Sequence, residues 1–152
     1  MKYLTTLIFA ALALLCLQAC TTTTGTNPDR SAAITSAVLE LAGTAIAPVL
    51  TNNPEYRPVA SGVAEALGTL ETGTITAETV RSFIAALAER QGWAPDQRAY
   101  AELMAASAWT IYTAQTGQTS APVSDPQTLA WISAFRRGLQ TAVALSAAPA
   151  SS

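Results

Sequence analysis

Apolar residues recur every three or four positions through most of this chain, and each such stretch is bounded by residues that start or stop helices. No stretch alternates apolar and polar residues for the length of a strand. Alanine, the strongest helix former, is among the commonest residues. A period near 3.6 places the apolar residues on one side of a helix. The pattern therefore predicts an all-α fold, a single small bundle of about five helices.

Turn and capping residues divide the pattern into five segments. The expected helices cover residues 29–50, 55–70, 77–91, 95–116 and 126–146. Thr76 should cap the third helix, and Gly92 and Gly117 should end the third and fourth. Pro48 either kinks the last turn of the first helix or ends that helix early.

The first helix carries two apolar stripes. One stripe consists of Ile34, Val38, Leu41, Ala45 and Val49. The other consists of Leu39, Gly43, Ile46 and Leu50, more than ~100° away around the helix. A helix that is apolar on two sides is usually buried between neighbours. We therefore expect this helix at the centre of the bundle, with both stripes in the core.

The other four helices each show one inward face. For the second helix the expected inward residues are Tyr56, Val59, Val63, Leu67 and Leu70, and for the third they are Val80, Phe83, Ile84, Leu87 and Gln91. For the fourth they are Tyr100, Leu103, Met104, Ser107 and Ile111, and for the fifth Ile132, Phe135, Leu139 and Val143. These single faces would cover the two sides of the first helix.

The first twenty residues follow a different pattern. Lys2 precedes an apolar stretch, residues 3–17, that runs into Leu17-Gln18-Ala19-Cys20. This arrangement resembles the signal peptide and lipobox of bacterial lipoproteins. The resemblance implies cleavage before Cys20, acylation of its thiol and new amino terminus, and a mature chain held at a membrane. An uncleaved anchor is an alternative, although the stretch is shorter than the ~20 residues of a spanning helix; ordinary secretion is another.

The resemblance covers residues 1–20 only, and it sets the expected organisation of the chain. Residues 1–19 would be the signal peptide, 20–28 the lipidated cysteine and a Thr-rich tether, 29–146 the helical domain and 147–152 a disordered tail. Thr21 stands where an Asp retains many Gram-negative lipoproteins in the inner membrane. The resemblance therefore implies the periplasmic face of the outer membrane, with the inner membrane as the alternative.

The residue types present exclude several chemistries. The chain has no histidine, and its two cysteines are Cys16 in the leader and Cys20 at the lipid site. The helical domain therefore lacks the usual zinc ligands, the Ser-His and Cys-His catalytic pairs and any disulfide. The net charge is −2, without the basic stripe that nucleic-acid binding requires. We expect no metal, no cofactor and no nucleic acid.

Carboxylates are the remaining candidates for catalysis. Asp29, Asp96 and Asp125 stand at helix starts, where capping explains them. Two glutamates from neighbouring helices could hydrolyse a glycan, although no spacing favours such a pair. The glutamates considered are Glu65, Glu71, Glu78 and Glu89. We expect a protein that is not an enzyme.

Three aromatic residues are the candidates for binding. Trp109 lies about 180° from the inward face of its helix, and Tyr112 lies close to it. Trp131 lies at the rim of the apolar face of the last helix. These residues either form a second core face, serve as an exposed anchor for a protein partner, or line a ligand pocket.

The sequence favours a membrane-anchored periplasmic lipoprotein that acts as a non-catalytic structural or protein-interaction module. The first alternative is a carrier of a small apolar ligand, bound between the first and fourth helices. The second is a carboxylate-based periplasmic hydrolase. A carrier predicts a contiguous apolar cavity of roughly a few hundred Å³. An interaction module predicts a filled core and an apolar surface patch around Trp109 or Trp131.

Overall fold

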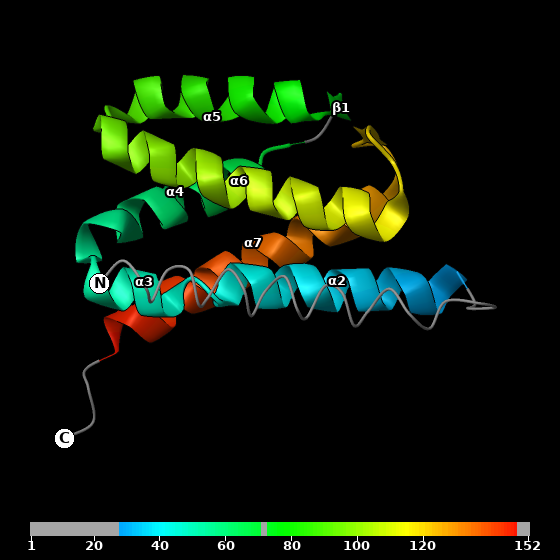
Figure 1. The fold of residues 1–152 in the computed structure, drawn as a ribbon, viewed down its shortest axis with the longest axis horizontal. Coiled ribbons are helices and arrows are strands. Elements are labelled where there is room, and N and C mark those ends of the chain that lie inside the picture. Colours follow the sequence, from blue (N-terminus) through cyan, green and yellow to red (C-terminus); the bar gives the residue numbers. More distant parts are fainter. Residues whose placement is uncertain (1–27, 71–72, 149–152) are drawn as a thin grey trace. The chain divides into compact units, whose positions relative to one another are not determined.

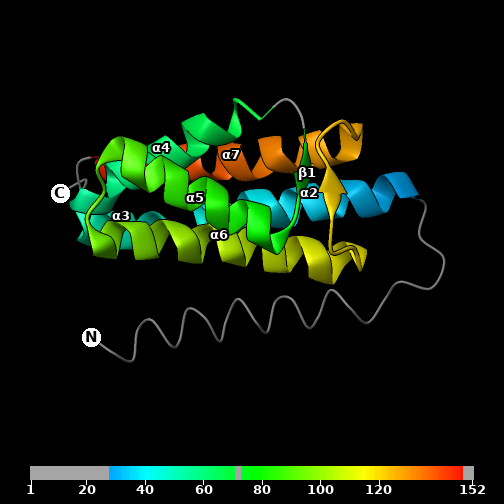
Figure 2. The same cartoon turned by 90° about the horizontal axis from the view of Figure 1, so that it is seen from above.

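The computed structural model describes residues 28–70 and 73–148, and most of these residues are helical (Figures 1 and 2). The elements are α2 (Pro28–Thr44), α3 (Ala47–Asn52), the short 3-10 helix η1 (Pro54–Tyr56), α4 (Arg57–Leu67), α5 (Ala77–Gln91), α6 (Pro95–Thr116) and α7 (Pro126–Ala147). The predicted all-α bundle is confirmed, with the first expected helix present as two pieces. The signal peptide, Cys20, residues 21–27 of the tether and residues 149–152 of the tail lie outside the described residues.

The chain from Ala32 onward forms one compact unit, and the packing described below lies within it. Its buried core is drawn from α2 through α7. The largest fully buried side chains are Leu50, Ile84, Leu139, Val59, Val63, Val123 and Thr35. Every expected helix therefore contributes to a common interior.

The first predicted helix is interrupted near Pro48. α2 ends at Thr44, and α3 begins at Ala47 with the proline in its first turn. Proline has no N–H to donate, and its ring fits the first turn of a helix better than the interior. The expectation that Pro48 interrupts this helix is confirmed.

Of the two sides of α2 that were expected in the core, only one faces it. Leu39 is only 3% exposed, and Gly43 is also buried, so the second apolar stripe faces inward. Ile34 and Leu41, of the first stripe, are 43% and 59% exposed. The prediction that both stripes lie in the core is therefore wrong for the first stripe. A periodic pattern identifies the apolar sides of a helix but not which side meets a neighbour.

α2 and α7 cross with their backbones in contact at Gly43 and Gly138 (Figure 1). A methyl group added to Gly138 would overlap the carbonyl oxygen of Glu40 and would lie 2.9 Å from the Cα atom of Gly43. A methyl group added to Gly43 would lie 2.8 Å from the carbonyl oxygen of Phe135. Neither position has room for a side chain, so the crossing requires glycine on both helices.

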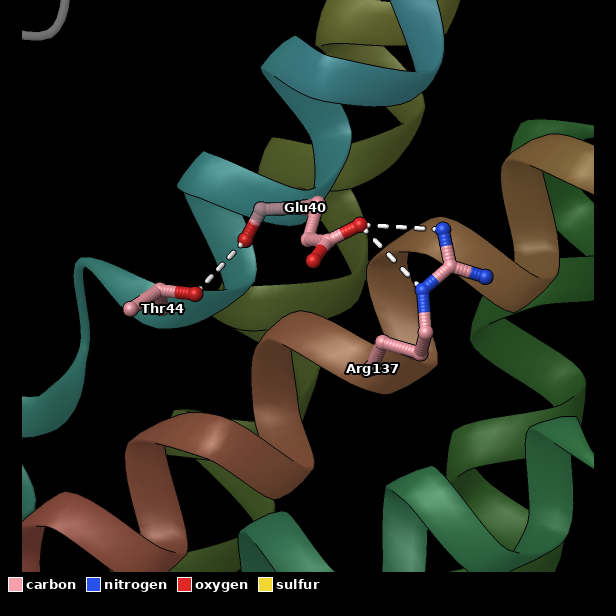
Figure 3. A network of polar contacts seen from close by, with 3 residues as sticks. All are labelled: Glu40, Thr44 and Arg137. Atoms are coloured by element: carbon pink, nitrogen blue, oxygen red, sulfur yellow. Dashed lines mark hydrogen bonds and ion pairs between the residues drawn. The ribbon is translucent and has the colours of Figure 1, made fainter.

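An ion pair lies beside this crossing (Figure 3). Arg137 of α7 donates to Glu40 Oε2 from Nη2 at 2.9 Å and from Nε at 3.2 Å. Thr44 Oγ1 donates to the backbone carbonyl of Glu40 at 2.9 Å. Both charged side chains are about half exposed, so the pair contributes at most about 1 kcal/mol. The glycine contact, rather than this ion pair, fixes how α2 lies on α7.

The ends of α5 and α6 confirm the local signals in the sequence. Thr76 Oγ1 accepts a hydrogen bond from the N–H of Thr79 at 3.2 Å, and Thr79 Oγ1 accepts one from the N–H of Thr76 at 2.7 Å. This reciprocal pair satisfies two N–H groups that the helix itself cannot. Gly92 and Gly117 end the two helices at φ of 65° and 69°, a region that favours glycine.

The inward faces of α4 to α7 largely match the prediction. The predicted residues that are buried are Val59, Val63, Ile84, Leu87, Met104, Ile111, Phe135 and Leu139. Two were placed wrongly, since Leu103 is 47% exposed and Gln91 is exposed. In addition to Met104 and Ile111, the buried residues of α6 are Ala101 and Tyr112. Ala101 faces the core although its side chain is small. A prediction that gives more weight to larger apolar side chains chooses Leu103 instead.

A short antiparallel ribbon was not expected from the sequence. β1 (Thr74–Ile75) pairs with β2 (Ala121–Pro122), and the N–H of Val123 donates to the carbonyl of Gly73 at 2.9 Å. The ribbon joins the α4–α5 connection to the α6–α7 connection (Figure 2). Ala121 and Val123 are each 1% exposed. The ribbon therefore belongs to the packed domain and defines one end of the site described next.

Candidate functional site

An apolar cavity of about 290 Å³ lies beside the β1–β2 ribbon and is partly open to solvent. Its walls come from α4, α5, α6 and α7, with one residue, Leu39, from α2. The carrier hypothesis placed a ligand between the first and fourth expected helices. The fourth, α6, does form a wall, but α4, α5 and α7 form more of the cavity than α2 does.

The three aromatic candidates meet in this wall. The Trp109 and Tyr112 rings stack with centroids 5.0 Å apart, and the Trp131 ring meets Tyr112 edge-on at 4.9 Å. All three line the cavity. Tyr112 and Trp131 are each only 5% exposed, and Trp109 is partly exposed. The burial of Tyr112 and Trp131 fits both the second core face and the ligand pocket, and it does not fit exposed anchors for a protein partner.

Small residues next to large ones account for the empty space. Ala105 and Ala108 lie on the same face of α6 as Trp109 and Tyr112, at spacings of three and four residues. The two methyl side chains reach less far than the rings beside them. This alternation of alanine and aromatic residues along one helix face is visible in the sequence. It is the signal that could have identified a cavity wall in advance.

The polar groups around the cavity are few. The Tyr112 hydroxyl donates to Gln118 Oε1 at 2.7 Å, which ties the ring to the α6–α7 connection. Burial raises the pKa of Tyr112, with Asp125 adding to the effect and a hydrogen bond from Thr116 opposing it. The hydroxyl therefore keeps its proton at neutral pH. Trp131 Nε1 is buried and has no acceptor within the described parts of the chain.

The described lining of the cavity holds few groups that could take part in acid–base chemistry. Among residues 28–70 and 73–148, no charged side chain lines it. Thr79 and Thr128 face it, but both hydroxyls have partners: Thr79 Oγ1 accepts from the N–H of Thr76, and Thr128 Oγ1 donates to Asp125 Oδ2. A general acid or base needs a titratable group within hydrogen-bond reach of the reacting atoms. Within the described lining, Tyr112 carries the only titratable group, and its hydroxyl donates to Gln118.

The candidate carboxylates lie elsewhere. Glu65, Glu78 and Glu89 are exposed. Asp125 accepts from the N–H of Gln127 at 3.1 Å, as the predicted cap of α7, and Asp96 accepts from the Tyr56 hydroxyl at 3.2 Å. Within the described residues, no group of three or more His, Cys, Asp or Glu side chains could hold a metal. Glu71 and Cys20 lie outside the described residues, and Asp29 is described only as part of the α2 backbone.

Comparison with protein-family models, curated proteins and solved structures gave no match to this chain. Function is therefore inferred from the cavity itself.

Proposed function

We propose that this protein binds a small apolar molecule in the cavity, and that lipid on Cys20 holds it at a bacterial membrane. The observation that carries the binding role is the contiguous apolar space of about 290 Å³. Native interiors contain few voids larger than a water molecule. An engineered cavity of about 150 Å³ stays dry and binds benzene, so this one has room for roughly a dozen non-hydrogen atoms.

The energetics favour an occupied cavity. The cavity exposes apolar side chains to solvent, which is unfavourable in proportion to their apolar area. A ligand of matching shape covers these side chains and leaves water as well. Because no charged group among the described residues lines the cavity, the role we propose is a non-catalytic carrier or sensor.

A cavity-filling substitution tests this role. Decanol is expected to bind the chain that starts at Thr21, which keeps every residue of the hydrophobic core. Ala108→Phe should abolish this binding, because the added ring is benzene-sized and fills about half of the cavity. Tryptophan fluorescence reports the result, since Trp109 and Trp131 line the cavity and Trp93 does not.

Ala106→Phe is the matched control, since Ala106 lies on the exposed side of the same helix. It should bind decanol as the wild type does. Binding of decanol to Ala108→Phe with unchanged affinity, or no binding to the wild type, would contradict the carrier role.

The lipid anchor has its own test. Labelled palmitate should be incorporated into the wild type, whereas Cys20→Ser should take up no label and remain uncleaved. Cys16→Ser is the control, because that cysteine would leave with the signal peptide and its loss should not affect labelling. Continued labelling of Cys20→Ser would exclude the lipoprotein assignment and, with it, the membrane location.

A structural role at the bilayer surface is the second candidate, favoured by the exposed stripe of α2. Residues Ala32–Asn52 are apolar and long enough to cross a membrane, and only 22% of their most apolar window is buried. The helix break and the α7 contact instead make them part of the folded domain. Seven residues separate Cys20 from Pro28, so a lipid on Cys20 would keep α2 within about 28 Å of its attachment point. Ile34 and Leu41 would then rest on the bilayer, and this role predicts no decanol binding.

A further inference from the structure

Arg136 is a partly buried cation with no ion-pair partner among the residues that the structure describes. Its Nε atom is buried and has no hydrogen-bond acceptor, and no carboxylate in residues 28–70 or 73–148 pairs with it. Its neighbour Arg137 is exposed and bonds to Glu40. A buried N–H group that lacks an acceptor is costly. The position of Arg136 is therefore unusual for a solvated surface arginine.

The guanidinium of Arg136 lies against Gly68, where α4 ends. Its Cζ and Nη1 atoms lie 2.8 and 2.9 Å from the point where a Cβ on Gly68 would stand. Leu67 and Leu70, on either side of that glycine, line the cavity. On α7, Ile132 lies one turn before Arg136 and also lines it. Because Gly68 has no side chain, the guanidinium fits against it. Gly68 and Arg136 are each next in sequence to a lining residue, Leu67 and Phe135, but do not themselves line the cavity.

We propose that the natural ligand is an amphiphile of the fatty-acid type, whose hydrocarbon chain fills the cavity and whose carboxylate binds Arg136. This inference rests on the proposed carrier function. A guanidinium can donate two parallel hydrogen bonds to one carboxylate, and it stays protonated at physiological pH. The carbonyl end of α4 already favours a cation here, which explains how Arg136 is tolerated before a ligand binds.

The other charged side chains described near Arg136 do not compete with a ligand carboxylate for its guanidinium. Glu65 lies one turn before Gly68 on α4 but is exposed and makes no ion pair with Arg136. Arg137, on the same helix, is engaged by Glu40. Glu71 lies outside the described residues, three positions after Gly68. If Glu71 permanently neutralised Arg136, a carboxylate ligand would gain nothing over a neutral one.

The test compares decanoate with decanol on the chain that starts at Thr21. The two probes share a ten-carbon chain and differ in the charged head. Decanoate is expected to bind roughly ten- to a hundredfold more tightly, as a charge-assisted hydrogen bond predicts. Arg136→Gln should remove that advantage and leave decanol binding unchanged. Arg137→Gln, the matched control, should leave both affinities unchanged.

The outcomes separate this inference from the proposed function. Equal binding of decanoate and decanol to the wild type would overturn the role of Arg136 while leaving the carrier function intact. An advantage for decanoate that survives in Arg136→Gln would overturn it as well. Failure of both probes to bind would overturn the carrier function itself. The wild-type comparison requires no substitution, so it holds even if Arg136→Gln folds poorly.

Discussion

Gly138→Ala is expected to lower the free energy of unfolding by about 3 kcal/mol, the result of forcing a methyl group into a backbone contact. The new carbon would overlap the carbonyl oxygen of Glu40 and press on Gly43. These are backbone atoms, so no change of rotamer relieves the clash, and α2 must move away from α7. Alanine normally stabilises a helix by about 1 kcal/mol relative to glycine, so the expected loss is a net value. Urea denaturation measures it.

The control for this substitution lies on the same helix. Ser133 is exposed, so Ser133→Ala should leave stability unchanged or raise it by a few tenths of a kcal/mol. Gly43→Ala should destabilise in the same direction as Gly138→Ala, because it inserts a methyl group from the other side of the contact. If Gly138→Ala unfolded at the same urea concentration as the wild type, α2 and α7 would not cross at these glycines.

Helix boundaries were predictable because their causes are local. Thr76, Gly92 and Asp125 act on N–H and carbonyl groups within a few residues of themselves, and each does so where the sequence placed it. The interruption at Pro48 has the same origin, since a proline affects the turn in which it stands. Such signals need no knowledge of the rest of the fold.

The orientation of the helices was not predictable in the same way. Leu39 and Leu41 are both apolar, and only the crossing at Gly43 and Gly138 decides that the side carrying Leu39 faces inward. That contact joins residues 95 positions apart. The exposure of Leu103 is a similar case, because it depends on which side of α6 meets its neighbours.

The candidate site was found in part. The sequence identified Trp109, Tyr112 and Trp131, and the structure brings all three into one wall of the cavity. It gave a ligand cavity only as an alternative, between the first and fourth helices. Empty space is a property of several elements together: Leu39, Val63 and Ala121 line the cavity from distant parts of the chain. The position of Arg136 beside Gly68 has the same long-range origin, and the role of Cys20 stays a prediction.

Leu39→Ala is expected to lower the free energy of unfolding by about 2–5 kcal/mol, the usual effect of shortening a packed leucine. Leu39 is 3% exposed and belongs to the main hydrophobic core. Leu41→Ala, two residues away on the same helix, should change it by no more than about 0.5 kcal/mol, because 59% of that side chain is already in solvent. The same leucine-to-alanine change therefore separates the two stripes of α2. Urea denaturation of the two variants, made in the chain that starts at Thr21, measures the difference.

The pair of variants also bears on what α2 does. A small effect of Leu41→Ala leaves Ile34 and Leu41 free for contact outside the domain, which the role at the bilayer surface requires. If both variants lost a similar and large part of the free energy of unfolding, the first stripe would be buried in solution. It would then be unable to contact a bilayer, which contradicts the second candidate function. A large loss for Leu41→Ala alone would reverse the orientation of α2 and remove Leu39 from the cavity wall. The carrier function survives in the first two cases, because each keeps Leu39 and the aromatic wall of α6 in place.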